Sequence, residues 1–177
     1  MLTKIIRFLM KVYLHCRKWW DPIIIPTKTK DNYKCNMQTF FKRVNALPYK
    51  QDPLKGLLDH TADPDTFFDE KDSGRDCDDW ARVASWWGVF HDYKAKEWVI
   101  CDPSSIKRAF QTMHVITTLE KDGKFWLINY QPQGPFESEE LALDYMKWYP
   151  SYKGNRTIVF YREIRLEDGE MRHIESV

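Results

Sequence analysis

The sequence has few cysteines, and they lie far apart. Its 177 residues contain four, Cys16, Cys35, Cys77 and Cys101, with no C-x-x-C pair and no cysteine–histidine cluster. This spacing gives no reason to expect a zinc site. Four scattered cysteines in a chain of this size are also not typical of a disulfide scaffold. A chemical role for cysteine, if there is one, must therefore come from a single thiol and its surroundings.

The chain also lacks a dominant charge and a long apolar run. Its 27 Lys and Arg residues almost balance 26 Asp and Glu residues, so the net charge of +1 gives no reason to expect a nucleic-acid partner. Without an uninterrupted apolar stretch we expect neither a signal peptide nor a transmembrane span, and a cytoplasmic location. Aromatic residues are abundant, with 8 Trp and 9 Tyr. Residues 1–177 should form one domain with a packed core.

Residues 73–84, SGRDCDDWARVA, predict a tight turn that leads into a helix. Asp76 is a good N-cap, and Asp79 stands where a capping box places its second acid. Cys77 would then be the first helical residue, where the positive end of the helix dipole favours a thiolate. The neighbouring carboxylates oppose thiolate formation, and many buried cysteines have no chemical role. A nucleophile at Cys77 therefore requires a base elsewhere in the chain.

The helix should continue to about His91. Ala81, Ala84 and Gly88 follow Cys77 on one face, and such small side chains allow a sheet to approach closely. The residues expected to point inward are Trp80, Val83, Ala84, Trp87 and Phe90. We therefore expect a buried helix whose first turn presents Cys77 beside a sheet.

Two runs rich in β-branched and apolar residues, 113–119 and 125–130, predict a β-hairpin. Asp122-Gly123 between them is the strongest short-range hairpin signal. A two-residue turn there sets Lys121 opposite Lys124.

The same register sets Ile116 opposite Asn129 and His114 opposite Gln131. Because side chains alternate between faces, His114 and Asn129 then share one face as diagonal neighbours. Such neighbours are roughly 7 Å apart at the backbone, which a side-chain hydrogen bond can span.

Cys77, His114 and Asn129 together have the composition of a catalytic triad. A neutral imidazole takes the proton of the thiol, and the resulting ion pair supplies the nucleophile. The amide oxygen of Asn129 can accept from the other ring nitrogen and fix the tautomer. Each residue taken alone could be purely structural, as a buried cysteine, a core histidine or an asparagine at a strand end. The order of the three along the chain, and the shared face of His114 and Asn129, favour a catalytic role.

Residues 74–81, GRDCDDWA, resemble the G-x-D-C-D-D-[YFW]-A signature of bacterial and phage transglutaminase-like cysteine peptidases. Residues 49–59 and the strands around His114 and Asn129 also look like parts of this superfamily, so the resemblance covers about the middle half of the chain. It implies an α+β fold with a papain-like core, in which the nucleophile helix packs on an antiparallel sheet. Arg75 departs from the small or acidic residue common there, and either offsets nearby carboxylates or contacts an acidic substrate.

The resemblance implies a cysteine hydrolase, a peptidase or amidase that cleaves a protein or peptide amide bond through a thioester, with no cofactor and no metal. The oxyanion would be held by the Cys77 amide and by Gln51 or Tyr49. We favour Gln51, because a carboxamide donates without titrating. The alternatives are a transglutaminase or deamidase acting on glutamine, and a binding module without turnover. Asn129 stands where many members have aspartate, which argues against transfer to amines. The site of action is then the cytoplasm or a virus particle.

Segments on either side of the predicted core (36–131) have patterns of their own. Residues 1–20 predict an amphipathic helix with Ile5, Leu9, Val12, Cys16 and Trp19 on one face. It could lie on an anionic membrane surface, but we favour packing on its own domain. Residues 138–177 predict a helix begun by Ser138, followed by a terminal β-hairpin that extends the sheet. Further expectations are a helix at 36–46, a charged turn at 94–97, a strand at 98–101, a polar connection at 104–111 anchored by Ile106 and Phe110, and inward-facing Leu141, Tyr145 and Trp148.

Overall fold

The computed structural model describes residues 2–18, 30–49, 67–68, 75–147, 157–167 and 170–175. The elements in chain order are α1 (Leu2–Lys18), α2 (Lys30–Tyr33), α3 (Met37–Asn45), α4 (Cys77–Phe90), β1 (Lys94–Cys101), α5 (Ile106–Gln111), β2 (His114–Lys121), β3 (Lys124–Asn129), β4 (Gln131–Phe136), α6 (Glu139–Lys147), β5 (Thr157–Glu167) and β6 (Glu170–Glu175).

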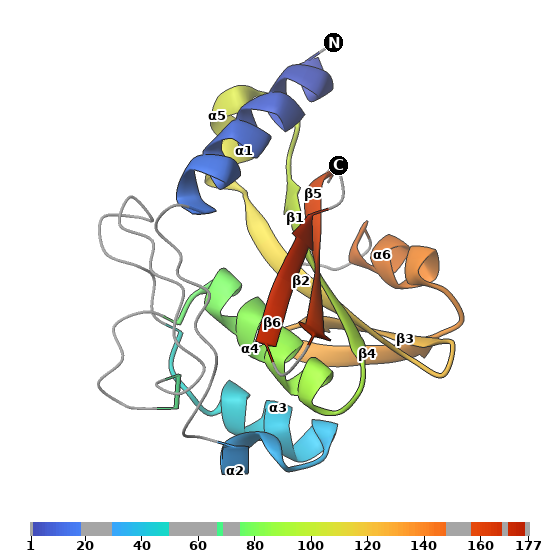
Figure 1. The fold of residues 1–177 in the computed structure, drawn as a ribbon. Coiled ribbons are helices and arrows are strands. Elements are labelled where there is room, and N and C mark those ends of the chain that lie inside the picture. Colours follow the sequence, from blue (N-terminus) through green and yellow to red (C-terminus); the bar gives the residue numbers. More distant parts are fainter. Residues whose placement is uncertain are drawn as a thin grey trace.

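Six strands form one antiparallel sheet in the order β4-β3-β2-β1-β5-β6. Figure 1 shows α4 on one side of this sheet and α6 on the other, with α2 and α3 beyond α4 and with α1 and α5 at the opposite end. The prediction of an α+β fold with a helix packed on an antiparallel sheet is confirmed. The terminal hairpin is confirmed as well, because β5 pairs with β1 and β6 completes that edge.

Strand β4 was not predicted, because residues 131–136 contain two prolines and look like a loop. The strand lies at the edge of the sheet, where it pairs only with β3. Proline has no N–H to donate to a neighbour, and an edge strand is the place where this loss is tolerated.

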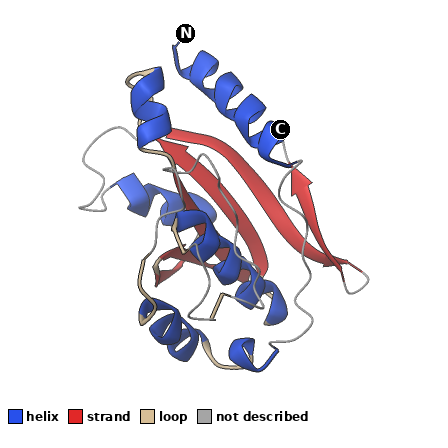
Figure 2. Ribbon diagram, turned by 90° about the vertical axis from the view of Figure 1, so that its left-hand side faces the viewer, coloured by secondary structure: helices blue, strands red, loops and turns tan. Residues whose placement is uncertain are grey.

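Helix α4 is buried on nearly all sides, from Asp78 to Val89. One face packs on the sheet, as Figure 2 shows, and the other meets an aromatic cluster that includes side chains of α3 and Phe67. The prediction that Phe90 points inward is wrong, because its side chain is 44% exposed. The ring of His91 lies against Trp87 in a tilted arrangement, with 4.4 Å between the centroids and 32° between the planes.

The small residues of α4 allow β2 to approach closely, as predicted. The Thr117 hydroxyl on β2 donates to the Ala81 carbonyl oxygen over 2.9 Å. Farther along, a Cβ built on Gly88 would lie 2.3 Å from Leu119 Cδ2, which is inside van der Waals contact. These two contacts hold the helix that carries Cys77 against the strand that begins at His114.

Replacing Gly88 with alanine should therefore destabilise the fold by about 1–3 kcal/mol, since overpacking of a filled core forces its neighbours to move. Urea unfolding of the parent and Gly88→Ala proteins measures this loss. Leu119→Val removes the side-chain ends that clash, so Gly88→Ala should cost less in that background. An equal cost in both backgrounds would contradict the close contact.

The charged turn expected at residues 94–97 is wrong, because β1 already begins at Lys94. Along this strand, Lys94 and Lys96 pair with glutamates of β2 and α6. Ala95 between them and Glu97 after them are buried, and Glu97 forms an ion pair with Arg82 of α4. The two lysines alternate with buried residues, as a strand requires, but the partner of the buried Glu97 is remote in sequence.

Two further expectations about helices need correction. The polar connection at 104–111 contains helix α5, which begins after an N-cap at Ser105, and its expected anchors Ile106 and Phe110 are 42% and 41% exposed. Ala109 is the buried residue of α5.

Helix α6 follows Ser138 as predicted, but Leu141 and Tyr145 are exposed while Ala142 and Met146 face the sheet. Trp148 lies outside the described residues. In α6 the buried residues each follow the predicted ones by one position, whereas the single buried residue of α5 precedes the predicted Phe110 by one position.

Helix α1 packs against the end of the sheet through Ile6, which is 1% exposed and joins a cluster with Val99, Cys101 and Ala109. The predicted contact with the domain is therefore present, but the predicted face is not the buried one. Ile5 and Val12 are 42% and 45% exposed, and Trp19 lies outside the described residues. None of the helices in the described ranges is long and apolar enough to cross a membrane.

Candidate active site

Cys77 is the first residue of α4, as the sequence predicted. The side chain of Asp76 accepts from the Asp78 amide over 3.4 Å, and the amide of Asp76 donates to Asp79 Oδ2 over 3.0 Å. The Asp76 side chain also accepts from the Asp79 amide, and this bond together with the one from the Asp76 amide to Asp79 Oδ2 forms a capping box, which fixes the backbone on both sides of Cys77. The Cys77 thiol is partly exposed at the start of an otherwise buried helix.

The segment before the helix is held by buried hydrogen bonds. Arg75 Nε donates to the carbonyl oxygen of Phe67 over 3.0 Å, and Trp80 Nε1 donates to the carbonyl oxygen of Arg75 over 2.9 Å. Arg75 is only 2% exposed, so the interpretation that it contacts an acidic substrate is wrong. Its guanidinium instead binds the Phe67 carbonyl oxygen and so holds the segment that precedes Cys77 in place.

The β2–β3 hairpin has the predicted two-residue turn and register. Asp122 and Gly123 have φ values of 53° and 72°, as a tight turn of the primed type requires. Lys121 faces Lys124, and the pairing continues to Thr117 and Ile128. His114 and Asn129 lie just beyond this paired stretch, at adjacent strand ends.

His114 and Asn129 are joined by a hydrogen bond of 2.9 Å between Nε2 and Oδ1, and both are buried, at 7% and 4% exposure. An amide oxygen can only accept, so Nε2 carries the proton and Nδ1 of the neutral ring has a lone pair. The predicted side-chain contact is thus confirmed. The expected pairing of His114 with Gln131 is not seen, because the chain reverses at Tyr130 (φ 62°) and Gln131 pairs with Asn129.

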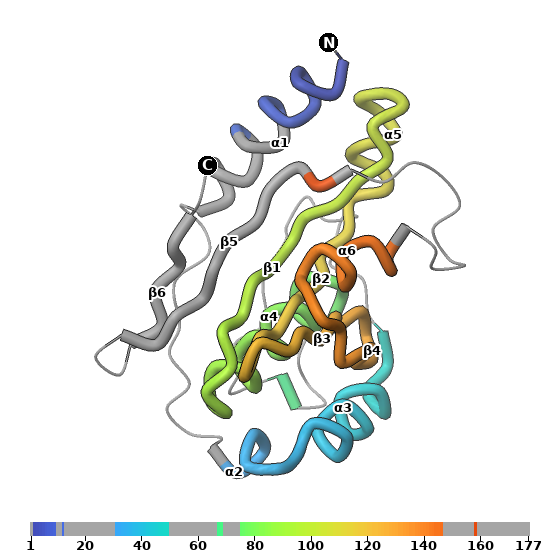
Figure 3. The backbone as a smooth tube through the Cα atoms, turned by 90° about the vertical axis from the view of Figure 1, so that its right-hand side faces the viewer, coloured from blue at the N-terminus to red at the C-terminus, as the bar shows by residue number. Residues whose placement is uncertain are grey.

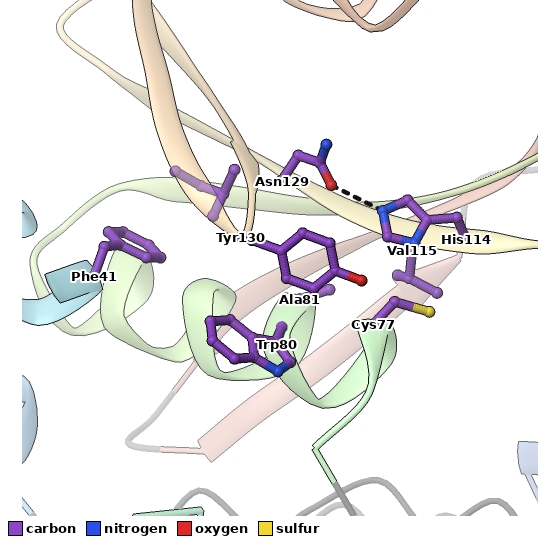
Figure 4. A pocket seen from close by; sticks show the side chains of 9 residues that line it. Phe41, Cys77, Trp80, Ala81, His114, Val115, Asn129 and Tyr130 are labelled. Atoms are coloured by element: carbon purple, nitrogen blue, oxygen red, sulfur yellow. Dashed lines mark hydrogen bonds between the residues drawn. The ribbon is translucent and has the colours of Figure 1, made fainter. Parts of the chain in front are cut away.

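One pocket contains all three predicted triad residues. Figure 4 shows the His114 imidazole above the Cys77 side chain, with Asn129 on the far side of the ring. The lining residues are Phe41, Cys77, Trp80, Ala81, His114, Val115, Ile128, Asn129 and Tyr130. The pocket joins residues from α3, α4 and the β2–β3 hairpin, which are far apart in the sequence.

Tyr130 is a pocket residue that sequence reasoning did not single out. Its ring lies 5.4 Å from Trp80 and 5.6 Å from His114, measured between centroids. In Figure 4 its hydroxyl points towards the side of the pocket that holds Cys77 and His114. Its position directly after Asn129 was the available signal, but its left-handed backbone could not be foreseen. Such a conformation is uncommon for a non-glycine residue and clusters at functional sites.

Of the two residues considered as oxyanion donors, only Tyr49 belongs to the described part of the chain. Gln51 lies outside the described residues. Tyr49 is described, is 58% exposed and has its ring 6.5 Å from that of Tyr130. Tyr49 therefore reaches the border of the pocket, and its role stays a prediction, as does that of Gln51.

Asp76, Cys77 and Asp78 each offer a ligand atom, and these atoms lie within 4.8 Å of one another. The capping geometry already explains the position of the Asp76 carboxylate, and the three residues are consecutive. This cluster gives no ground for assigning a metal.

The pocket brings together a thiol and an imidazole, the two groups that proton transfer from cysteine to histidine requires. The Thr117–Ala81 bond fixes α4 against β2, the Asn129 amide orients the imidazole, and the capping box fixes the start of α4. A substrate carbonyl beside Cys77 would also lie at the positive end of the α4 dipole, which attracts negative charge. Comparison with known proteins adds no assignment, because no family model, curated protein or solved structure matches the chain.

Proposed function

We propose that the chain is a cysteine hydrolase that cleaves amide bonds in a protein or peptide. The observation that carries the proposal is the His114–Asn129 hydrogen bond in a pocket that also contains Cys77 at a helix start. Each residue alone is common in a protein core. Their combination supplies a nucleophile, a base with a defined tautomer and a group that orients the base.

In the proposed reaction, Nδ1 of His114 takes the proton of the Cys77 thiol, and the sulfur attacks the substrate carbonyl carbon. A carbon–sulfur bond forms, and the carbonyl oxygen carries the negative charge of the tetrahedral intermediate. The carbon–nitrogen bond then breaks while His114 gives its proton to the leaving amine. Water, deprotonated by His114, hydrolyses the thioester, which releases the carboxylic acid and restores the thiol.

The amide of Cys77 is the first donor we assign to the oxyanion, because it belongs to the start of α4. Gln51 or Tyr49 would supply the second. We also propose that the α4–sheet unit is a papain-like core of the transglutaminase-like type. This is supported by the order of the three residues along the chain and by their placement on one helix start and one antiparallel hairpin.

Product masses test the reaction class. The protein is incubated with a peptide library, with and without an added primary amine, and the products are read by mass spectrometry. Hydrolysis predicts new peptide termini that do not depend on the amine. Amine adducts would indicate a transglutaminase, a gain of one mass unit at glutamine a deamidase, and an unchanged library a binding module.

Replacing Asn129 with alanine should lower kcat less than replacing Cys77 or His114 with alanine, since the amide orients the base and does not exchange protons. KM should change little. Steady-state kinetics on a peptide cleaved by the parent protein, or on p-nitrophenyl acetate, measures the difference. Equal losses from all three variants would mean that Asn129 has a direct chemical or folding role.

A further inference from the structure

Helix α1 has apolar side chains that its contact with the domain leaves exposed to solvent. Ile6 is buried at 1% exposure, while Ile5, Phe8 and Val12 are 42%, 65% and 45% exposed. The three exposed residues are spaced three and four apart, so they lie along one side of the helix. This stripe is distinct from the side that carries Ile6.

The exposed stripe lies on a helix whose charged residues are all basic. Helix α1 and helix α5 contain no Asp or Glu, although the whole chain carries 26 acidic residues against 27 basic ones. Their basic residues are Lys4, Arg7, Lys11, Arg17, Lys18, Lys107 and Arg108. Arg108 forms an ion pair with Asp102, with 3.5 Å between Nε and Oδ2, so the excess of positive charge in these two helices comes from the other basic residues.

Helices α1 and α5 lie side by side at this end of the molecule, because Ile6 and Ala109 belong to one cluster. Figures 1 and 3 show the two helices together at this end of the sheet. Helix α5 adds a fourth exposed apolar side chain, Ile106 at 42%. We call Ile5, Phe8, Val12 and Ile106, together with the exposed basic residues Lys4, Arg7 and Lys107, the apolar-basic surface.

We propose that the apolar-basic surface docks the protein on an anionic lipid membrane, with α1 lying in the plane of the interface. Apolar side chains enter the boundary between headgroups and acyl chains, and neighbouring Lys and Arg side chains contact anionic headgroups. A second copy of the chain fits less well, because pairing two such surfaces would bring like charges together. A nucleic acid would satisfy the basic residues but leave the apolar stripe in water.

Docking at this surface would also bring the candidate active site near the membrane. Met113 and Val115 pack against the cluster that holds Ile6, and His114 stands between them in the chain. The docking itself does not depend on turnover, so Cys77→Ala should bind membranes as the parent protein does.

The test is cosedimentation of the full chain with vesicles of phosphatidylcholine alone or mixed with phosphatidylglycerol. We expect binding to the mixed vesicles, little binding to phosphatidylcholine alone, and weaker binding at high salt. The variant Ile5→Gln/Phe8→Gln/Val12→Gln should reduce the partition coefficient by at least about tenfold. Its melting temperature should not change, because the replaced side chains are exposed. Lys4→Gln/Lys107→Gln should weaken binding to the anionic vesicles.

The matched control is Phe90→Gln/Leu141→Gln, which removes side chains of similar exposure (44% and 52%) from the end of α4 and from α6. It should bind as the parent does. The proposal is overturned if the triple variant and the control bind alike, or if no vesicle binds the parent protein. It is also overturned if the parent binds polyglutamate but not vesicles, which would indicate an acidic protein partner, or forms a dimer that the triple variant abolishes.

Discussion

Replacing Cys77 with alanine should abolish turnover, with a loss of roughly a thousandfold or more. The thiol is the group that bonds to the substrate in the proposed mechanism, and no other described residue of the pocket offers a comparable nucleophile. The melting temperature should stay near that of the parent, because the capping box that fixes this turn uses Asp76 and Asp79. Steady-state kinetics and thermal unfolding measure the two quantities.

The matched control is Cys35→Ala, which removes another partly buried thiol. Cys35 Sγ donates to the carbonyl oxygen of Asn32 over 3.5 Å and does not line the pocket, so turnover should persist. His114→Ala should be as damaging as Cys77→Ala, and the double variant should lose no more than either single one, because the two groups act as a unit. Full activity of Cys77→Ala would remove the assigned nucleophile.

Replacing Glu97 with glutamine should lower the free energy of unfolding by about 3–5 kcal/mol. Arg82 Nε of α4 and Glu97 Oε1 of β1 are 3.1 Å apart, and their side chains are only 8% and 1% exposed. Arg82 Nη2 already has no hydrogen-bond partner. Losing the carboxylate charge would leave a buried guanidinium without compensation, and urea unfolding measures the cost.

Two variants separate the effect of burial from that of charge. Glu120→Gln removes an exposed ion pair with Lys94, whose side chain is 68% exposed, and should cost less than about 1 kcal/mol. Arg82→Met/Glu97→Leu removes both buried charges and should recover most of the stability lost in Glu97→Gln. A double variant less stable than Glu97→Gln would mean that the pair holds α4 on the sheet in a way that packing cannot replace.

The parts of the site that could be predicted depend on residues close together in the sequence. Asp76 and Asp79 form their capping box within one helical turn, so the position of Cys77 was evident. Asp122-Gly123 fixed the hairpin register, and from that register His114 and Asn129 could be placed next to each other. Local backbone geometry determined these features, and tertiary contacts did not alter them.

The parts that could not be predicted depend on remote partners. Glu97 is a strand residue because Arg82 neutralises it from another element. Tyr130 enters the pocket because the chain reverses at a positive φ, which a tyrosine seldom adopts. Helix α6 buries Ala142 where the pattern favoured Leu141, since the sheet it covers already presents large side chains such as Trp98 and Ile116.

Competitive labelling of the thiols tests the central claim most directly. The folded protein is treated with a limiting amount of iodoacetamide, and the adducts are mapped by mass spectrometry in the parent and in His114→Ala. The mechanism predicts that Cys77 reacts first in the parent and loses this advantage in His114→Ala, because the imidazole takes its proton. Preferential labelling of Cys16, Cys35 or Cys101, or an equally fast Cys77 in His114→Ala, would contradict the assignment of a Cys77–His114 pair.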